Sequence, residues 1–470
     1  MAADDCAKDF VEDVQWGLEL KSLEVQKDTD QFLNRSSAIV GRTVMTLRIY
    51  LVIIAACTIG TAAAQTAMPT SSASSRAVAQ WAVQVPSATV TFSSAPIDAR
   101  VILGETYVHG SINGSRTLDV VLDSAASVSI VAPRLADELH LKTGETRVAA
   151  GPGNGGDNLL HMVQDVTLKL GATMLTRQTI AALPIDYVAQ RIGVPTEGIF
   201  GGNFFSRMVI DEDYAAHAVR LIDPATFTLP AGFVSIPVNV AGWVAFTQLT
   251  LKAPDGSRVS GTFLIDSGLV GDLVFTEPFV RAHPELLSGK RVDAPSIPAV
   301  GGAVQLQVGR IPTLTLGPFV LKEPVAAFPS NASGVLANEE VAGILGNGVL
   351  RRFHVIFDWP NGRILLAPGP DVNLPFPANC SGLSLEVAPP IYHRLRVNAV
   401  IADSPAAQAG ILAGDVIEAV ARGTGKLHPD VGLELASVRT ELEEPGKTFL
   451  VLIERNGKPM QLTIVTRELY

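Results

Sequence analysis

The chain has 470 residues, of which 47% are hydrophobic and only 17% are charged, and its net charge is −10. This length exceeds what one hydrophobic core supports, so two to four domains are expected. The 41 glycines and 30 prolines favour a mainly β protein with many short strands and turns. The acidic balance argues against a nucleic-acid-binding surface, so we predict no nucleic-acid partner. The eight histidines are scattered singly, and we predict no metal site and no cofactor.

The N-terminal part of the chain contains a pattern typical of secretory signal peptides. Residues 45–64 begin with a basic stretch at Met45, continue through a short apolar run and end in Ala62-Ala63-Ala64. The apolar run is too short for a comfortable membrane span. Because signal peptides normally begin a chain, we interpret Met45 as the true start and residues 1–44 as a doubtful N-terminal extension. We therefore predict an exported protein, either periplasmic or secreted.

Two other interpretations of this segment stay open, and only these two predict a membrane as partner. If the segment is not cleaved, it anchors the protein in the membrane, facing the periplasm. Alternatively, the run that ends in Cys57 has the form of a lipid attachment site. Of the other two cysteines, Cys6 and Cys380, only Cys380 survives processing, so no internal disulfide is expected. Residues 65–84, rich in Ser, Ala and Thr, are predicted to form a flexible linker.

After the linker, short apolar runs broken by Gly, Pro, Asn and Asp indicate β-strands. Two of these runs end alike, in Val121-Leu122-Asp123-Ser124-Ala125 and in Leu264-Ile265-Asp266-Ser267-Gly268. A single Asp-Ser after a strand usually only makes a turn. Two copies inside a longer matching frame indicate a repeated structural unit.

That frame repeats at nearly constant spacing. The hairpin signals Asn113-Gly114 and Asp255-Gly256 lie ten and eleven residues before the two aspartates. Downstream, Gly198-Ile199-Phe200-Gly201 begins 75 residues after the first aspartate, and Gly343-Ile344-Leu345-Gly346 begins 77 residues after the second. We infer an internal duplication of about 145 residues.

The duplication defines the domains. Its copies are predicted to form two lobes, residues 85–228 and residues 229–378. The remaining residues, 379–470, have a different pattern. The run from Ser404 to Ile411 predicts a short helix with Pro in its first turn. The run Leu412-Ala413-Gly414-Asp415-Val416-Ile417 predicts a turn that leads directly into a strand.

The paired frames resemble the two lobes of an aspartic protease, and above all the bacterial retropepsin-like group (pepsin/retropepsin-type), in which one chain carries both lobes. The run from Ser404 to Ile417 resembles a PDZ domain of the bacterial periplasmic-protease kind. Together the two likenesses cover about residues 85–470. They imply a mainly β fold, with two tandem acid-protease-like β-barrel lobes that form a cleft, followed by a small α+β PDZ domain at residues 379–470.

The chemistry of peptide hydrolysis explains why the aspartates come as a pair. Without a metal or a covalent intermediate, hydrolysis needs a base that activates water and an acid that polarises the carbonyl. Two carboxylates a few Å apart supply both, because one of two close like charges keeps its proton. The resemblance assigns this role to Asp123 and Asp266. It also places Gly201 and Gly346 on strands that pass behind the catalytic loops, where small residues let backbones approach.

The resemblance further assigns residues that support the catalytic loops. Ser124 and Ser267 would brace the loops through hydroxyl-to-backbone hydrogen bonds, with Ala125 and Gly268 next in the chain. Ala125 departs from the family pattern, which has Gly after the Asp-Ser or Asp-Thr pair. The bulky Leu269 after Gly268 departs from it as well. Either departure marks a tuned enzyme or an inactive one.

A flap over the cleft is also implied by the resemblance. The best candidate is a glycine-rich stretch between strand-like runs, which contains Gly151, Gly153, Gly155 and Gly156. The alternative is a loop without this role.

The PDZ-like part would capture a peptide C-terminus by strand addition. We assign this contact to Leu395, Arg396 and Val397. Protein C-termini are therefore predicted partners of this domain, next to peptide or protein substrates of the lobes. The alternative is a domain that only packs on the protease lobes or folds back on their cleft.

The leading hypothesis is an exported aspartic endopeptidase with a PDZ domain for substrate selection or regulation. Its rival is a catalytically inactive, bilobed peptide-binding protein that retains the protease fold. A serine nucleophile at Ser124 or Ser267 is a third alternative. It is disfavoured because no Gly-x-Ser-x-Gly elbow is present and no histidine repeats with the frame.

Overall fold

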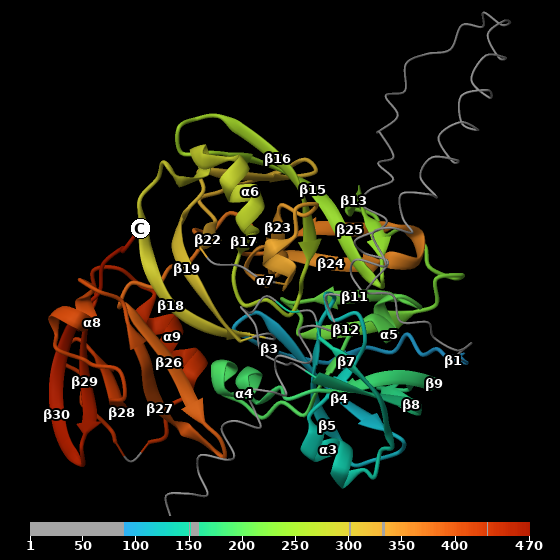
Figure 1. Ribbon diagram of the computed structural model, residues 1–470, viewed down its shortest axis with the longest axis horizontal. Coiled ribbons are helices and arrows are strands. Elements are labelled where there is room, and N and C mark those ends of the chain that lie inside the picture. The colour runs from blue at the N-terminus through green and yellow to red at the C-terminus, as the bar shows by residue number, and fades with distance from the viewer. Residues whose placement is uncertain (1–88, 150, 152–158, 300–301, 331–333, 430) are drawn as a thin grey trace, which may run out of the picture. The chain divides into compact units, whose positions relative to one another are not determined.

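The computed structural model describes residues 89–149, 151, 159–299, 302–330, 334–429 and 431–470. The predictions for residues 1–44, 45–64 and 65–84, with those for Cys6 and Cys57, lie outside these ranges. The described chain is mainly β, as the composition predicts. Figure 1 shows its strands gathered into several sheets. None of the described helices is long and apolar enough to cross a membrane.

The first lobe contains one sheet of nine strands among the described residues. These strands are β1 (Val90–Thr91), β3 (Arg100–Ile102), β4 (Glu105–Ile112), β5 (Leu118–Leu122), β6 (Ile130–Val131), β7 (Thr143–Val148), β8 (Leu159–Leu170), β9 (Thr173–Ala182) and β10 (Gly198–Phe200). Its helices are α3 (Pro133–Glu138), α4 (Asp186–Ile192) and α5 (Gly202–Phe205). Between β4 and β5, Asn113 and Gly114 have φ of 51° and 73°, as the predicted hairpin turn requires.

The second lobe contains a sheet of ten strands within the described ranges. These strands are β14 (Asn239–Ala241), β15 (Val244–Lys252), β16 (Arg258–Ile265), β17 (Leu273–Phe275), β18 (Arg291–Ala299), β19 (Gly302–Arg310), β20 (Thr313–Leu316), β21 (Phe319–Lys322), β22 (Val325–Pro329) and β23 (Gly343–Leu345). Its helices are α6 (Glu277–Ala282), α7 (Asn347–Leu350) and the 3-10 helices η1 (Pro284–Leu287), η2 (Gly334–Ala337) and η3 (Trp359–Asn361).

The two sheets share a strand order. In the first lobe it runs β9-β6-β10-β5-β4, and in the second it runs β22-β17-β23-β16-β15. In each lobe the strand before the Asp-Ser pair lies parallel to the strand of the Gly-x-x-Gly motif, so that Leu122 pairs with Phe200 and Ile265 pairs with Leu345. The same topology in both halves is what a duplicated sequence produces.

A third sheet joins the lobes. Its six strands in the described chain are β2 (Ile97–Asp98), β11 (Val209–Asp213), β12 (Ala218–Ile222), β13 (Val234–Pro237), β24 (Phe353–Asp358) and β25 (Arg363–Pro368). Asp211 on β11 pairs with Ile356 on β24. These positions are 145 residues apart, the same interval as the duplication. Each copy therefore pairs with its own equivalent, which places a pseudo-twofold axis at this point of the sheet.

The last part of the chain forms a separate α+β unit. Its five strands are β26 (Leu383–Ala388), β27 (Ile391–Val400), β28 (Val416–Arg422), β29 (Thr448–Arg455) and β30 (Lys458–Val465), paired in chain order among the described residues. Its helices are α8 (Pro405–Gln408) and α9 (Leu435–Leu442). The predicted helix begins at Pro405, where the Ser404 hydroxyl accepts a hydrogen bond from the Ala407 backbone N–H.

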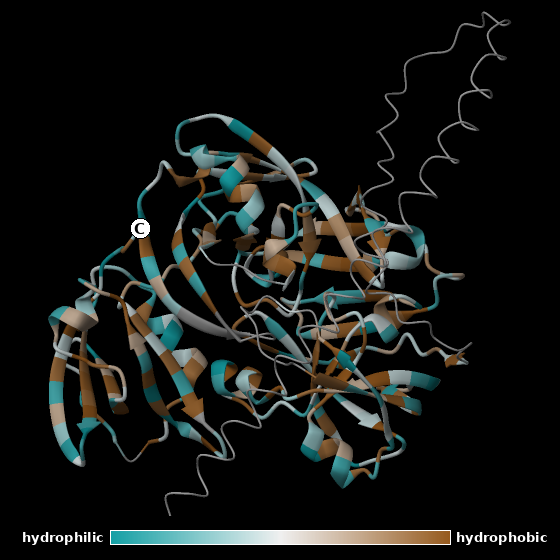
Figure 2. Ribbon diagram, in the orientation of Figure 1, coloured by the Kyte–Doolittle hydropathy of each residue, from teal (hydrophilic) through white to brown (hydrophobic). Residues whose placement is uncertain are grey.

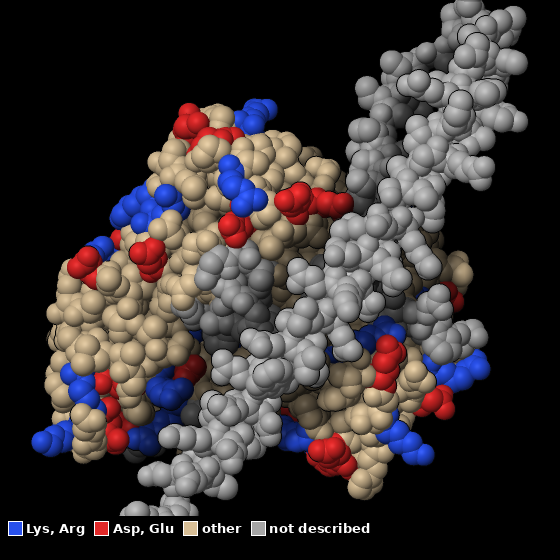
Figure 3. Space-filling model, in the orientation of Figure 1, with Lys and Arg blue, Asp and Glu red and all other residues tan. Residues whose placement is uncertain are grey.

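The two lobes share one hydrophobic core, and the C-terminal unit has its own. One large cluster of buried residues includes side chains of both lobes, such as Phe205 and Phe357. The C-terminal unit has its own cluster around Leu395 and Phe449. Figure 2 shows hydrophobic residues alternating with hydrophilic ones along several strands, the pattern of half-buried sheets. On the face seen in Figure 3, basic and acidic side chains are interspersed rather than gathered by sign.

His354 on β24 lies between two carboxylates of the joining sheet. Its Nε2 atom is 2.5 Å from Oδ1 of Asp211, and its Nδ1 atom is 3.5 Å from Oδ2 of Asp213. Burial lowers the pKa of His354, but the hydrogen bond to Asp211 and the two negative charges outweigh it and raise this pKa above its usual value. A raised pKa in the folded state means that folding favours the protonated imidazole.

We therefore expect His354→Gln to destabilise the protein most below pH 6.5, which is about the pKa of histidine in unfolded chains. The difference should shrink as the pH rises through the folded-state pKa, because the stabilising charge is then lost. Apparent unfolding temperatures of both proteins between pH 5.5 and 9 would measure it. The exposed His428 supplies the control His428→Gln, and a pH-independent difference for His354→Gln would contradict the prediction.

Candidate active site

The two Asp-Ser loops follow equivalent strand ends. The Asp123 backbone N–H donates to Phe200 O over 3.1 Å, and the Asp266 N–H donates to Leu345 O over 2.9 Å. Each aspartate thus leaves its own strand (β5 or β16) while still bonded to the parallel strand beside it. This parallel neighbour fixes the point at which the chain turns toward the other lobe.

The serines after the aspartates bind each other's loops. The hydroxyl oxygen of each serine accepts a hydrogen bond from the backbone N–H of the other serine, both over 3.0 Å. Each hydroxyl also donates to a carbonyl of the opposite lobe: Ser124 to Ile265 O at 2.9 Å and Ser267 to Leu122 O at 3.3 Å. Both side chains are buried. Four hydrogen bonds thus join the loops directly beneath the aspartates.

Asp123 and Asp266 line the same cleft. A Cβ atom on Gly268 would lie 2.6 Å from Cγ and 2.7 Å from Oδ2 of Asp123. The carboxylate of Asp123 therefore packs directly against the loop that carries Asp266, and a side chain in place of Gly268 would displace it. The loops bring together two aspartates that are 143 residues apart in the sequence.

The aspartates differ in the hydrogen bonds that they accept. Asp123 Oδ1 accepts the backbone N–H groups of Ala125 (2.8 Å) and Ala126 (3.0 Å), whereas Asp266 Oδ1 accepts that of Gly268 (2.9 Å). Burial raises the pKa of Asp123, while its two N–H donors oppose the rise. Burial and then the charge of Asp123 raise the pKa of Asp266 well above its usual value. The charge of Asp123 thus adds to burial in raising the pKa of Asp266, which favours the protonated form of this carboxyl group.

Ala125 and Leu269, the two departures from the family pattern, share one environment. Both pack against the apolar cluster of the second lobe that contains Val244, Phe246 and Leu336. Ala125 is not among the described residues with positive φ, so its Cβ atom brings no backbone strain. The methyl group therefore adds an apolar contact between the lobes, and it leaves the hydrogen bond from its own N–H to Asp123 in place.

The glycines behind the loops have little space around them. A Cβ atom on Gly201 would lie 2.2 Å from Ala126 O, and one on Gly346 would lie 2.4 Å from Gly271 O. Both distances are far shorter than a carbon–oxygen contact permits. These positions require the absence of a side chain, which agrees with the close backbone approach that the sequence predicts.

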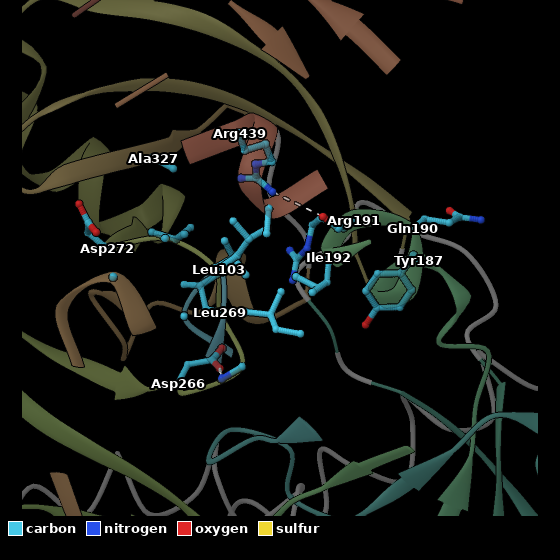
Figure 4. A pocket seen from close by; sticks show the side chains of 18 of the residues that line it. Leu103, Tyr187, Gln190, Arg191, Ile192, Asp266, Leu269, Asp272, Ala327 and Arg439 are labelled. Carbon is cyan, nitrogen blue, oxygen red and sulfur yellow. Dashed lines mark hydrogen bonds between the residues drawn. The ribbon is translucent and has the colours of Figure 1, made fainter. Parts of the chain in front are cut away.

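The aspartates open into a cleft of about 1690 Å³. Its lining comes from both lobes and from the C-terminal unit. Figure 4 shows Leu103 and Leu269 between Asp266 on one side and Arg191 and Arg439 on the other. Apolar side chains form much of the wall, and charged side chains such as Arg191, Asp272 and Arg439 line the cleft as well.

The predicted flap falls at the end of the β7–β8 hairpin. Gly151 is buried, and its carbonyl accepts the Val335 N–H over 3.2 Å, so this end of the hairpin contacts η2 of the second lobe. Gly153, Gly155 and Gly156 lie outside the described residues.

The residues predicted for strand addition lie inside the C-terminal sheet. Leu395 and Arg396 on β27 pair with β26 on one side and with β28 on the other, and Val397 pairs with β26 while its N–H donates to Asp415 O. Their backbone groups are therefore already used. The free edge of the sheet on this side is β26, which lies beside α9. A peptide that adds to this side of the sheet as a strand therefore has to pair with β26. It cannot pair with Leu395, Arg396 and Val397, the residues assigned from the sequence.

Three charged residues near the aspartates were not predicted from the sequence. Glu105 on β4 is buried and paired with Arg191 of α4 at 3.2 Å. Arg439 of α9 donates to the backbone carbonyl of Arg191 at 3.5 Å. Each stands alone in its stretch of sequence, so no spacing marks it; only a comparison of the two copies, strand by strand, would have singled out Glu105.

No group of three or more potential metal ligands occurs among the described residues.

Comparison with known proteins gives one family. The family model described as "Aspartyl protease" matches residues 108–204, which include the first Asp-Ser loop and the first Gly-x-x-Gly motif. The chain is also similar to the crystal structure of an aspartic proteinase from Irpex lacteus, at 11% identity and a TM-score of 0.37, covering 60% of this chain and 99% of that one. No curated protein matches the sequence. The match to the family model lies in the first lobe and supports a protease-type function.

Proposed function

We propose that the chain is an aspartic endopeptidase that hydrolyses peptide bonds with a water activated between Asp123 and Asp266. The observation that carries the proposal is the packing of the Asp123 carboxylate against Gly268, next to Asp266. Two half-buried carboxyl groups from two lobes in one cleft are the arrangement that acid–base hydrolysis needs. The signal-like segment at residues 45–64 supports an exported enzyme.

The different hydrogen bonds and neighbouring charges of the two aspartates support different roles for them. Ionised Asp123 takes a proton from water while the water oxygen bonds to the peptide carbonyl carbon. Protonated Asp266 gives its proton to the carbonyl oxygen, so no charge develops on the tetrahedral intermediate. When the C–N bond breaks, the proton taken by Asp123 passes to the leaving amine and the diol proton returns to Asp266. Both groups regain their starting states.

Asp123→Asn and Asp266→Asn should each reduce hydrolysis of a mixed peptide library by about 10²–10⁴-fold. In the wild-type protein the rate should rise with pH as Asp123 ionises and fall as Asp266 loses its proton. Because both pKa values are raised, this range should lie above the usual carboxyl range.

Hydrolysis assays from pH 3 to 8 on the wild type and both variants would measure this. Equal background in all three proteins would instead favour the alternative, a bilobed protein that binds peptides without cleaving them.

Gly268→Ala and Ala125→Gly form a matched pair at equivalent positions of the two copies. The first places a methyl group against the Asp123 carboxylate and should lower kcat by about 10²-fold, since misplacement by 1 Å can cost that much. The second removes a methyl group from an apolar cluster and should mainly lower stability, by about 1 kcal/mol.

The loss of kcat from Ala125→Gly should be much smaller than that from Gly268→Ala. A large gain in kcat for Ala125→Gly would show that Ala125 distorts the site and would contradict this account.

We propose further that residues 379–470 form a PDZ-like domain for substrate selection or regulation. The sheet edge β26 and the helix α9 beside it form the kind of groove to which a peptide adds as a strand. In this structure α4 of the first lobe packs against β26. Gly193, which follows α4, lies so close to Leu435 of α9 that an added Cβ atom would be 2.7 Å from the leucine Cβ atom. A peptide that enters this groove therefore has to displace α4.

Gly193→Ala should loosen α4 from α9 and strengthen binding of peptides with a free C-terminal carboxylate severalfold, because a larger fraction of molecules has an open groove. The control is Gly232→Ala, with a similar φ (+87° against +90°) but no neighbour within 4 Å of the new methyl group. Fluorescence anisotropy with a pool of labelled decapeptides, free or amidated at the C-terminus, would measure this. The proposal would be contradicted if free and amidated peptides bound equally well, or if no peptide bound to the wild type or to either variant. The domain would then only pack against the lobes.

A further inference from the structure

Glu105 is a buried carboxylate beside the candidate active site. It is 1% exposed, and its Oε1 atom is 3.2 Å from Nη2 of Arg191. The Oε2 atom of Glu105 and the Nε atom of Arg191 have no hydrogen-bond partner among the described residues. Burying an ion pair with polar atoms left unpaired costs free energy and is a poor device for stability. Another function of the pair would account for it.

The duplication shows what the fold itself requires at this position. Tyr107 on β4 pairs with the residue two before Asp123, and Phe246 on β15 pairs with the residue two before Asp266. Glu105 precedes Tyr107 by two residues, and Val244 precedes Phe246 by two, so Glu105 and Val244 are equivalent. Val244 is fully buried in an apolar cluster. A carboxylate at Glu105 is therefore not needed to build the strand.

Arg191, the partner of Glu105, also has no charged counterpart in the second lobe. Arg191 belongs to α4, which lies between β9 and β10, and the segment between the equivalent β22 and β23 holds η2. From η2, Leu336 packs in the same apolar cluster as Val244. The first lobe thus has a charged pair where the second lobe has an apolar one. Both pairs flank the same two aspartates.

The charged pair lies within electrostatic reach of the aspartates. Arg191 lowers the pKa of both Asp123 and Asp266, although burial dominates each and raises it. Glu105 acts in the opposite direction and raises the pKa of Asp266. The other titratable groups that face the pair are Tyr107, Tyr187, Arg439 and Glu443.

Glu105 has a pKa near neutrality. Burial raises the pKa of Glu105 to about 7, against the lowering effect of Arg191. Burial raises the pKa of Tyr187 to about 12 and that of Tyr107 still further, so neither tyrosine ionises in the working range.

The C-terminal unit holds the pair in place. Arg439 of α9 donates to the backbone carbonyl of Arg191, at the C-terminal end of α4 (Figure 4). A cation at a helix C-terminus interacts favourably with the partial negative charge of the last carbonyls. The contact fixes the helix end from which Arg191 reaches Glu105.

We propose that Glu105 and Arg191 form a positioning pair that sets the pH range of the Asp123–Asp266 pair, with Arg439 fixing the helix that carries Arg191. The inference rests on the proposed peptidase function. Removing the positive charge of Arg191 makes ionised aspartates less favourable, so both limbs of the pH profile move to higher pH. Glu105 has a negative charge only above about pH 7, so removing this charge moves the alkaline limb to lower pH. Opposite shifts from two partners of one ion pair are not expected of a merely structural role.

The test measures kcat/KM against pH for the wild type, Arg191→Gln, Arg191→Lys, Glu105→Gln and Arg439→Gln. Arg191→Gln should shift the whole profile to higher pH and Glu105→Gln should shift its alkaline limb to lower pH, each by about 0.5–1 pH unit. Arg191→Lys keeps the charge and should restore most of the wild-type profile. Arg439→Gln should shift the profile in the direction of Arg191→Gln, but less. Glu105→Gln changes no side-chain volume, so it keeps the test valid if an arginine variant fails to fold.

Arg116→Gln is the matched control, because Arg116 forms an exposed ion pair with Glu197 in the same lobe. Its profile should coincide with that of the wild type. An active wild type with unshifted profiles for Arg191→Gln and Glu105→Gln, or with shifts in the same direction, would overturn the inference and leave the peptidase function standing. An inactive wild type would overturn the peptidase function and the inference with it.

Discussion

The reciprocal hydrogen bonds between Ser124 and Ser267 are the constraint on which the site depends. Each serine hydroxyl accepts from the other loop and donates to the opposite strand, so neither lobe completes its loop alone. Because both hydroxyls are buried, losing one would leave unpaired groups at a cost of about 1–3 kcal/mol each. These bonds hold the backbones of the two loops together next to the aspartates. The joining sheet, symmetric about Asp211 and Ile356, holds the lobes in the same register.

The duplication builds a symmetric frame, and the departures from symmetry concentrate in the cleft. Gly268 makes room for the Asp123 carboxylate, whereas its counterpart Ala125 fills an apolar contact between the lobes. Glu105 stands where the second lobe has Val244. Two equal carboxyl groups would share a proton without preference. Unequal hydrogen bonds and an ion pair on one side give the two carboxyl groups different surroundings.

Local patterns in the sequence were sufficient for much of this fold. Asp-Ser after a strand, Asn-Gly at a hairpin and Gly where backbones touch depend on near neighbours, so repeated spacing predicted the paired loops. Contacts made by partners far apart in the chain left no such pattern. Which strand forms the edge of the C-terminal sheet depends on strand pairing, which the sequence does not show. The residues predicted for strand addition, Leu395, Arg396 and Val397, therefore turned out to lie on the inner strand β27, whereas β26 forms the edge. Glu105 resembles any polar residue in a strand until its counterpart Val244 is identified.

One helix, α4, connects the cleft of the lobes with the C-terminal unit, to which the sequence assigned separate functions. Its C-terminal end is held by Arg439 and lies against Leu435, while its Arg191 side chain reaches the ion pair beside Asp123. If peptide binding at β26 displaces α4, it also changes the charge seen by the aspartates. Thermodynamic linkage then requires the reverse effect: the protonation state of the pair must change the affinity of the groove by the same factor. Peptide affinity at the C-terminal unit would therefore depend on pH through groups in another lobe, and this dependence would disappear in a protein without Arg191.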